Sequence, residues 1–486
     1  MKKPHILLFN PDQWRGDWLG HLGFKAAVTP QLDLWAAGDA VSFRNTFCQN
    51  PVCTPSRCSF MTGWYPHVRG HRTMNHMLQA DEPVLLKRLK DAGYYVFWAG
   101  KNDLVPAQHS LEPYCSELSK PKVEQPSSHA LIHQAAEPLS FYLGCLKHDP
   151  SEGIYRDGDW GHIEAALERI KTYPDSEAGR LGQPLCLYLP IGYPHPPYGV
   201  EEPFYSSIQR DAIPACYPAG EGKPSILDGI RTGQNLGHWT EDQWRELRAT
   251  YLGMCARVDH QFSLILEALR EAGLYDDTAA FFFSDHGDYT GDYGLVEKTQ
   301  NTFEDCLTRV PLLFKPPAGV TCRPGVRDAL VELIDINATV EELAGLEPTH
   351  THFGRSLLRL AAGERREHRD AVFCEGGRLP DERHTREGVP LKEGEHVTPY
   401  WPRLSLQLGD GPEHGKAVMC RSRHFKYVRR LTERDEFYDL TRDPAELRNV
   451  IDDPAYADDV RWHKERLLTW FMETGDVVPF KPDRRW

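Results

Sequence analysis

The chain has 486 residues, of which 40% are hydrophobic and 26% charged, and its formal net charge is −14. That length can bury one large core and a smaller one, and the composition is typical of a globular protein. The negative charge argues against a nucleic-acid partner, and no run of about eighteen apolar residues indicates a membrane span.

The first apolar run, at residues 5–10, predicts a buried strand. This run is too short for a signal peptide, and the 12 cysteines show no close pairing pattern. Both observations favour a cytoplasmic protein with reduced thiols.

Asp12 and Gln13 come directly after this strand. Open α/β sheets bind ligands at the carboxyl ends of their strands, so Asp12 is a candidate metal ligand. An aspartate after a strand also caps turns, and the residues alone leave both roles open. A glutamine carbonyl can bind a hard cation, which makes Gln13 a second candidate ligand.

A helix is expected over residues 30–40 and a strand from residue 41, before a turn and helix that begin with CTPSR at residues 53–57. The proline of this stretch suits the first turn, where its missing N–H costs nothing. Cys53 is expected to be an exposed, activated thiol at the positive end of the helix, close to the Arg57 cation. The alternative is a turn that buries two unreactive thiols, Cys53 and Cys58.

Helices and strands alternate through the next three hundred or so residues. In chain order we expect a helix at 82–92, a strand at 94–99, a loop insertion at 105–160, a helix at 160–173, a strand at 185–192, a long helix at 240–272, strands at 278–284 and 310–315, and a helix at 325–346. The insertion is expected to cover the active-site face, because such loops commonly set specificity.

Candidate binding residues follow several of these elements. Asn75 belongs to a histidine-rich loop that fits a pocket wall and a surface loop equally well. Lys101 and Asp103 follow the strand at 94–99, and a lysine directly after an apolar run favours a pocket. His195 lies between prolines in a stiff, extended loop that suits a fixed hydrogen-bond donor.

Asp285 and His286 stand side by side at the end of the strand at 278–284. A buried carboxylate without a positive partner is costly, so a cation is expected beside them. The alternative is a turn in which Asp285 caps backbone donors and His286 faces solvent.

A charged run at 363–367 predicts a boundary between a catalytic domain at 1–366 and a C-terminal domain at 367–486. The second domain is expected to be a small α+β unit. Its predicted elements are antiparallel strands at 370–373, 417–420, 424–428 and 436–440 and a terminal helix at 455–475.

The CTPSR stretch resembles the signature of the type I sulfatases, which belong to the alkaline phosphatase superfamily. Ser-Asp-His-Gly at 284–287 and Gly-Leu-Val-Glu-Lys at 294–298 are similar to two further segments of that family, and the likeness covers the whole chain. Gln13 stands where many members have a second aspartate, and Asp103 where a histidine is common. The elements and the resemblance imply an α/β fold with a large mixed, mostly parallel sheet flanked by helices and a small C-terminal α+β subdomain.

The resemblance implies that Cys53 is oxidised to formylglycine (3-oxoalanine), whose hydrate acts as the nucleophile. It also implies one divalent metal ion, for which mostly oxygen ligands indicate Ca²⁺, while one imidazole leaves Mn²⁺ or Mg²⁺ open. The implied metal ligands are Asp12, Gln13, Cys53, Asp285 and His286. The implied catalytic residues are Cys53, Arg57, Lys101, His195 and Lys298. The residues expected to bind substrate are Lys101, His195, Lys298, Asn75 and Asp103.

The activity expected from this resemblance is hydrolysis of a sulfate monoester to an alcohol and inorganic sulfate. The expected partners are a small-molecule or saccharide sulfate ester and a formylglycine-generating enzyme that matures Cys53. Aryl, choline and carbohydrate sulfates are all compatible with the sequence, which leaves the oligomeric state open. The alternatives are a phosphonate monoester or phosphodiester hydrolase on the same scaffold and a catalytically silent binding protein.

Overall fold

The computed structural model describes residues 3–149, 151, 153–388, 398–482 and 484–485. Its centre is a nine-stranded sheet with the order β11-β2-β10-β8-β1-β6-β3-β4, in which β9 also pairs with β2. In chain order the strands are β1 (His5–Pro11), β2 (Val41–Phe47), β3 (Tyr95–Trp98), β4 (Glu117–Leu118), β6 (Leu185–Ile191), β8 (Thr278–Phe283), β9 (Arg309–Val310), β10 (Leu312–Lys315) and β11 (Gly325–Glu332).

Most neighbouring strands of this sheet run in parallel. β1 pairs in parallel with both β6 and β8 at the centre of the sheet. β10 is antiparallel to its two neighbours, β8 and β2. The predicted α/β fold with a large mixed, mostly parallel sheet is confirmed.

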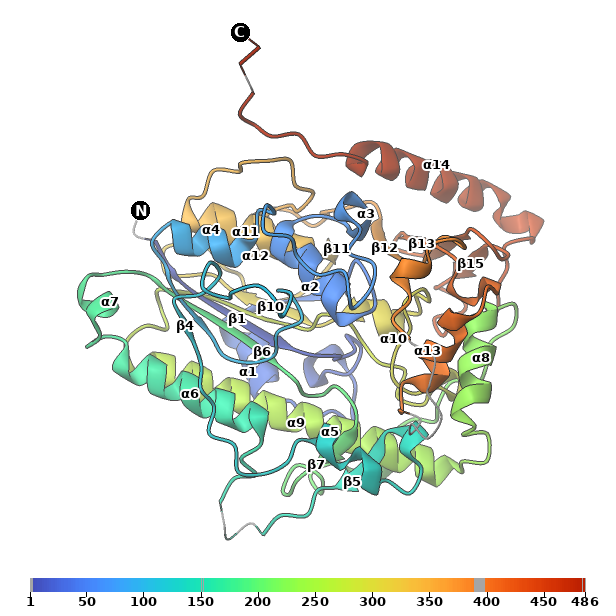
Figure 1. Ribbon diagram of the computed structural model, residues 1–486, viewed down its shortest axis with the longest axis horizontal. Coiled ribbons are helices and arrows are strands. Elements are labelled where there is room, and N and C mark those ends of the chain that lie inside the picture. Colours follow the sequence, from blue (N-terminus) through green and yellow to red (C-terminus); the bar gives the residue numbers. More distant parts are fainter. Residues whose placement is uncertain (1–2, 150, 152, 389–397, 483, 486) are drawn as a thin grey trace.

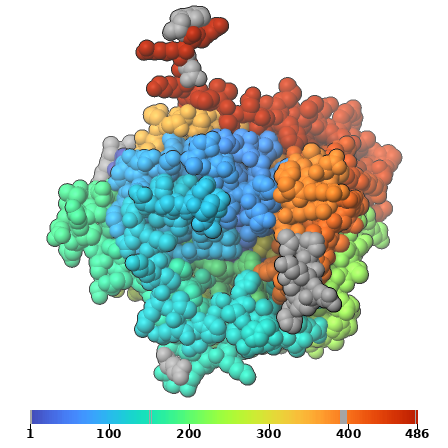
Figure 2. Space-filling view, in the orientation of Figure 1, coloured from blue at the N-terminus to red at the C-terminus, as the bar shows by residue number. Residues whose placement is uncertain are grey.

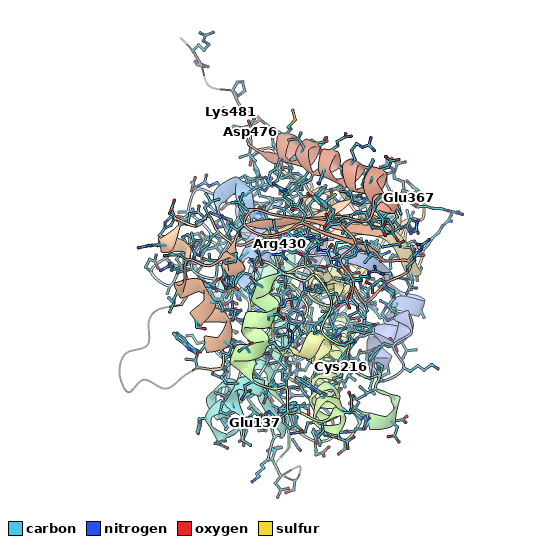
Figure 3. All side chains as sticks on the ribbon, turned by 90° about the vertical axis from the view of Figure 1, so that its right-hand side faces the viewer. Glu137, Cys216, Glu367, Arg430, Asp476 and Lys481 are labelled. Carbon is cyan, nitrogen blue, oxygen red and sulfur yellow. The ribbon has the colours of Figure 1, made fainter. Side chains whose placement is uncertain are left out.

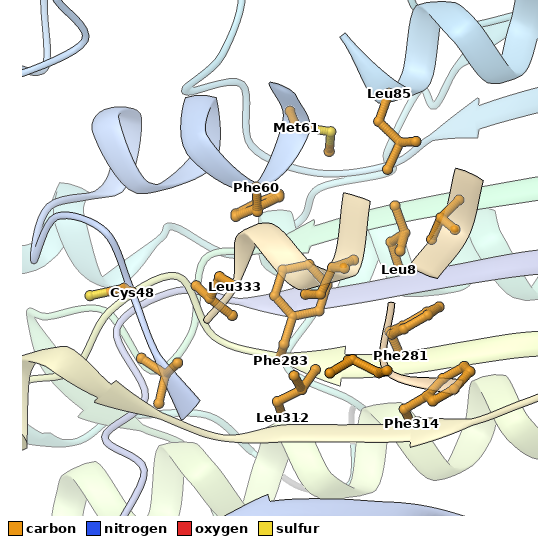
Figure 4. Close-up of a cluster of buried hydrophobic side chains, with 14 of the residues drawn as sticks. Leu8, Cys48, Phe60, Met61, Leu85, Phe281, Phe283, Leu312, Phe314 and Leu333 are labelled. Atoms are coloured by element: carbon orange, nitrogen blue, oxygen red, sulfur yellow. The ribbon is translucent and has the colours of Figure 1, made fainter. Parts of the chain in front are cut away.

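Both faces of the sheet are covered, because alternate side chains of each strand point to opposite faces. Leu8 of β1 packs into one buried cluster, and Phe9 packs into the other. Figure 4 shows the first cluster, where Phe60 lies over Phe283. In Figure 1, α2 (Cys53–Thr62), α4 (Leu85–Asp91), α11 (Ile334–Ala344) and α12 (Leu358–Ala361) lie on one side of the sheet, and α1 (Pro30–Gly38), α6 (Gly158–Thr172) and α9 (Glu241–Glu271) lie on the other.

The predicted helix over residues 325–346 is wrong in its first half. Gly325–Glu332 form β11, which pairs in parallel with β2, and α11 begins only at Ile334. A short apolar run fits a strand or a helix by its spacing alone. Backbone pairing with β2 decides between them here.

A small antiparallel sheet follows, with β12 (Val372–Gly376), β13 (Ala417–Arg421), β14 (Phe425–Arg430) and β15 (Glu436–Asp439) in sequential order. The terminal helix α14 (Ala457–Thr474) covers this sheet, and Trp470 stacks on Phe373. These elements match the predicted α+β unit, whereas the boundary at residue 366 stays a prediction. The backbone of Glu375 bonds to that of Gln49, so the small sheet lies against the segment that leads to α2.

The remaining elements are short and lie mostly in connections between the main strands. They are α3 (Pro66–Arg69), α5 (Ser128–Leu131), β5 (Tyr142–Cys145), α7 (Glu177–Arg180), β7 (Tyr198–Val200), α8 (Ser225–Gln234), α10 (Asp305–Thr308) and α13 (Trp401–Leu408). Figure 2 shows the insertion at residues 105–160, in teal, on the same face as the part of the chain that follows α12, in orange, which we call the C-terminal segment. None of the described helices combines the length and the apolar character that a membrane crossing requires.

Candidate active site

The ends of two central strands and the start of one helix meet at one point. Asp12 follows β1 and Asp285 follows β8, and because these strands are parallel neighbours their carboxyl ends lie at the same edge. His286 comes next in the chain, and Cys53 is the first residue of α2. The ligand atoms of these four residues all lie within 4.8 Å of one another. The structure therefore brings together four of the five predicted metal ligands.

Cys53 lies at the centre of this cluster. Its Sγ is 3.1 Å from Nε2 of His286 and 3.5 Å from Oδ1 of Asp12. The predicted exposure of this thiol is wrong, since Cys53 is 1% exposed and every residue of α2 is buried. Burial, followed by the charge of Asp12, raises the pKa of the Cys53 thiol. An unmodified thiol held in this way is a weak nucleophile at neutral pH.

Arg57 lies one turn further along α2 and contacts both carboxylates. Its Nε donates to Oδ2 of Asp285 at 2.7 Å, and its Nη2 donates to Oδ2 of Asp12 at 3.0 Å. All three side chains are fully buried. Although burial opposes it, Lys101 and Arg57 hold the pKa of Asp12 well below its usual range, so the carboxylate stays ionised.

His286 is held in the tautomer that a metal ligand requires. Its Nδ1 lies 3.0 Å from the carbonyl oxygen of Gly287, which can only accept a hydrogen bond. Nδ1 therefore carries the proton, and the lone pair of Nε2 faces Cys53 and Asp12. Burial lowers the pKa of His286, which keeps the ring neutral.

This donor set fits one divalent cation. Oδ1 of Asp12 and Nε2 of His286 are 3.5 Å apart, and Arg57 binds the other oxygen, Oδ2, of both Asp12 and Asp285. Two carboxylates and one neutral imidazole are ligands that Ca²⁺, Mn²⁺ and Mg²⁺ accept in proteins. The backbone N–H of His286 donates to Oδ1 of Asp285, which fixes that carboxylate at the edge of the cluster.

Lys101 reaches the cluster from the end of β3. Its Nζ is 2.7 Å from Oδ2 of Asp12 and 3.8 Å from Sγ of Cys53. Asp103 lies 2.8 Å from the same ammonium group and so holds it from the other side. The Lys101 side chain is partly exposed, whereas Asp12 is fully buried.

Lys298 and His195 contact each other beside the cluster. Nδ1 of His195 donates to the carbonyl of Pro196 at 2.5 Å, so its Nε2 accepts from Nζ of Lys298 at 2.9 Å. Burial and the charge of Lys298 hold the pKa of His195 well below its usual value. Nε2 of His195 is therefore an acceptor in this structure, whereas the sequence predicts a donor.

Gln13 links these residues to the strand ends. Its carbonyl oxygen accepts from Nζ of Lys298 at 2.6 Å, and its amide nitrogen donates to Oδ2 of Asp288 at 2.6 Å. The backbone of Gln13 has a φ of 69°, a conformation that is uncommon for residues other than glycine. The structure places Gln13 beside the lysine, and its role as a metal ligand stays a prediction.

Asn75 is the one predicted site residue that the structure does not join to the cluster. Its side chain is exposed, and no hydrogen bond within the described chain connects it with Cys53, Lys101 or Lys298. The part of Asn75 in substrate binding therefore stays a prediction.

Several residues at the site were missed by sequence reasoning. Asp288 stands two residues after His286, so the strand-end pattern offered a signal for it. Glu297 lies within ion-pair distance of Lys298 at 3.0 Å, and Arg403 lies 3.4 Å from Glu297. His129 and Tyr400 come from the insertion and the C-terminal segment, where no motif marks them.

We expect Arg403→Gln to lower kcat/KM by about tenfold, or roughly 1.4 kcal/mol in the barrier. Arg403 and Glu297 are both buried, so loss of the guanidinium leaves Glu297 free to draw Lys298 away from His195. The matched control is Arg430→Gln, which breaks a buried pair with Glu436 in the small sheet, where Figure 3 labels Arg430. Both variants should lower the unfolding temperature, and equal kcat/KM values in the two would contradict the proposed positioning role.

A protein-family model described as Sulfatase matches residues 4–346 of this chain. The chain is 26% identical to the multifunctional alkaline phosphatase superfamily protein PehA of Trinickia caryophylli, over 98% of this chain and 96% of that protein. It is 25% identical to arylsulfatase K of Danio rerio, over 98% of this chain and 89% of that protein. A similar solved structure is the phosphonate monoester hydrolase of Agrobacterium radiobacter, with a TM-score of 0.74, 23% identity and coverage of 99% and 100% of the two chains.

Proposed function

The chain belongs to the sulfatase family, and we propose that it hydrolyses the sulfate monoester of an alcohol with residue 53, as formylglycine, and one divalent metal ion. The observation that carries this proposal is the position of Cys53. Its sulfur lies beside the carboxylate of Asp12, the neutral imidazole of His286 and the ammonium group of Lys101, and the charge of Lys298 also acts on it. A sulfate ester needs such an arrangement, because its anionic oxygens repel a nucleophile until they are neutralised.

The metal ion, when bound, would neutralise a sulfate oxygen and favour the ionised form of the nucleophile. The aldehyde made from Cys53 would supply that nucleophile in its hydrated form. Arg57 donates to the carboxylates of both Asp12 and Asp285 and fixes them in place. Oxygen-rich ligands make Ca²⁺ the proposed ion, with Mn²⁺ and Mg²⁺ as the alternatives that one imidazole allows.

Lys101 and Lys298 would bind the remaining sulfate oxygens by charge-assisted hydrogen bonds. His195 and Gln13 both accept from Lys298 and so aim its ammonium group. Nε2 of His195 carries a lone pair, and the pKa of this ring is held low by burial and by Lys298. His195 therefore holds no proton on Nε2, and the ammonium groups of Lys101 and Lys298 would supply the proton to the departing alcohol oxygen, with His195 orienting Lys298.

The proposed location is a reducing compartment such as the cytoplasm. All 12 cysteines are unpaired thiols in the structure, which supports this proposal. The proposed maturation partner is an enzyme that oxidises Cys53 to the aldehyde.

A panel of three ester types tests the proposed reaction. We expect kcat/KM for 4-nitrophenyl sulfate to exceed the values for a 4-nitrophenyl phosphodiester and a phosphonate monoester by about tenfold or more. A sulfate monoester presents three terminal oxygens to the two lysines and the metal ion, whereas the other two esters present only two. The opposite order of rates would favour the alternative of a phosphonate monoester or phosphodiester hydrolase. No turnover of any ester would favour a silent binding protein.

A further inference from the structure

A small cavity opens next to the proposed sulfate site. Its volume is about 180 Å³, and Lys101 and His195 form one side of it. We call it the aspartate cavity, and its other lining residues are Ser127, Ser128, His129, Asp157, Gly158, Asp159, Gly192 and Tyr193. Because the cavity shares two side chains with the sulfate site, it is a place where the alcohol half of a bound ester can lie.

The cavity carries one carboxylate, Asp159, that no lysine or arginine of the described chain contacts. Asp157 is paired with Arg257 at 2.6 Å, and Lys101 is paired with Asp12 and Asp103. In the described part of the chain, Asp159 accepts hydrogen bonds from the backbone N–H groups of Gly192 and Tyr193, at 2.9 and 2.8 Å. Within the described chain, no lysine or arginine lies within 4.0 Å of its oxygens.

The two histidines of the cavity do not supply the missing positive charge. Burial, followed by the charge of Lys298 for His195 and of Lys101 for His129, lowers the pKa of both rings. Burial and the neighbouring Asp157 raise the pKa of Asp159 to about 6 although the charge of Arg257, itself paired with Asp157 and Glu201, opposes this rise, so Asp159 is largely ionised above neutral pH. The charge that the protein leaves uncompensated in this cavity is therefore negative.

The position of Asp159 is fixed relative to the reacting centre. The same Tyr193 that donates its N–H to Asp159 accepts, through its carbonyl oxygen, the N–H of Asp12 at 3.2 Å. A single residue, Tyr193, thus connects Asp159 to the backbone of Asp12, a proposed metal ligand. A group bound by Asp159 would be held at a set place relative to the sulfate.

We propose that the aspartate cavity binds the alcohol half of the substrate and that this alcohol is a small aliphatic one with an ammonium group, which pairs with Asp159. This inference rests on the proposed sulfatase activity and names its substrate class. The ester would carry its negative sulfate toward Lys101 and Lys298 and its positive end toward Asp159. Opposite charges at two ends of one small molecule match the opposite charges at the two ends of the site.

The size of the cavity supports a small alcohol. A volume of 180 Å³ corresponds to about six water molecules. A larger cavity of about 770 Å³ lies elsewhere, between the insertion and the start of α9, and Glu137 of its wall is labelled far from the small sheet in Figure 3. None of the residues that line this larger cavity belongs to the cluster around Cys53. It therefore carries no inference about the substrate.

The test compares two esters of nearly the same shape, 2-(trimethylammonio)ethyl sulfate and 3,3-dimethylbutyl sulfate, with 4-nitrophenyl sulfate as a third substrate. We expect the mature enzyme to favour the ammonium ester over its neutral counterpart by about tenfold or more in kcat/KM, as one ion pair at short range allows. Asp159→Asn should reduce this ratio toward one. Asp259→Asn should keep it, because Asp259 also accepts two backbone N–H groups but lies on α9, outside the cavity.

The possible outcomes separate this inference from the proposed function. If the enzyme releases sulfate from the neutral and aryl esters as fast as from the ammonium ester, the substrate class is wrong and the sulfatase activity stands. A preference for the ammonium ester that survives in Asp159→Asn also overturns the inference. If no ester releases sulfate, both proposals fail. The ratio in the unmodified chain needs no variant, so it decides even if Asp159→Asn does not fold.

Discussion

Replacing Cys53 by alanine is expected to lower turnover of a sulfate ester by about 10⁴-fold or more, as removal of a nucleophile does in other hydrolases. The neighbours of its sulfur are Asp12, His286 and Lys101, which hold charge and protons but offer no replacement for the attacking oxygen. The change removes one buried atom from a helix that stays fully packed, so folding should be preserved. The measurements are sulfate release and thermal unfolding of the same preparation.

Cys58→Ala is the matched control for this variant. Cys58 is also fully buried on α2, in the hydrophobic cluster that covers the sheet. Within the described residues, it forms no hydrogen bond with a predicted metal ligand. Both variants should lose about 1–2 kcal/mol of stability from the lost side-chain packing. Only Cys53→Ala should lose activity. Substantial sulfatase activity in Cys53→Ala would reject the assignment of the nucleophile.

The second large effect is expected from Asp285→Asn, which should abolish metal binding together with activity. Asp285 supplies one of the two carboxylates of the cluster and also neutralises the buried Arg57. Loss of its charge leaves the guanidinium partly uncompensated, which typically costs about 3–5 kcal/mol when a buried pair is broken. Metal content of the purified protein, measured by elemental analysis, reports the first effect independently of turnover.

The control variant Asp335→Asn separates the loss of metal binding from the loss of stability. Asp335 is a fully buried aspartate that pairs with Arg369, next to the small sheet, and it is not a member of the cluster. Its loss should lower the unfolding temperature to a similar degree while the metal content stays the same. If the metal content falls equally in both variants, or falls in neither, Asp285 is not a metal ligand.

Much of the site follows from one regularity of the sequence. Asp12, Lys101 and Asp285 each come directly after an apolar run, and parallel strands carry such residues to the same edge of a sheet. The order of the strands was not needed for this prediction. The sequence alone therefore predicts the site residues that lie at the strand ends.

The rest depends on contacts between distant segments, which leave no local pattern. His129 comes from the insertion, and its Nε2 lies 3.0 Å from the hydroxyl of Tyr400 in the C-terminal segment. Its ring centroid is 5.7 Å from that of His195. The exposure of Cys53 was mispredicted for a similar reason, because the burial of α2 results from the packing of Phe60 and its neighbours on the sheet.

Mass spectrometry of the peptide that contains residue 53 tests the central claim most directly. In an active preparation we expect the side chain to be an aldehyde, which a hydrazide reagent captures, and the captured fraction to rise in proportion to specific activity. The same preparation should contain one equivalent of a divalent metal ion. Full sulfatase activity in a preparation whose Cys53 is an unmodified thiol would contradict the account.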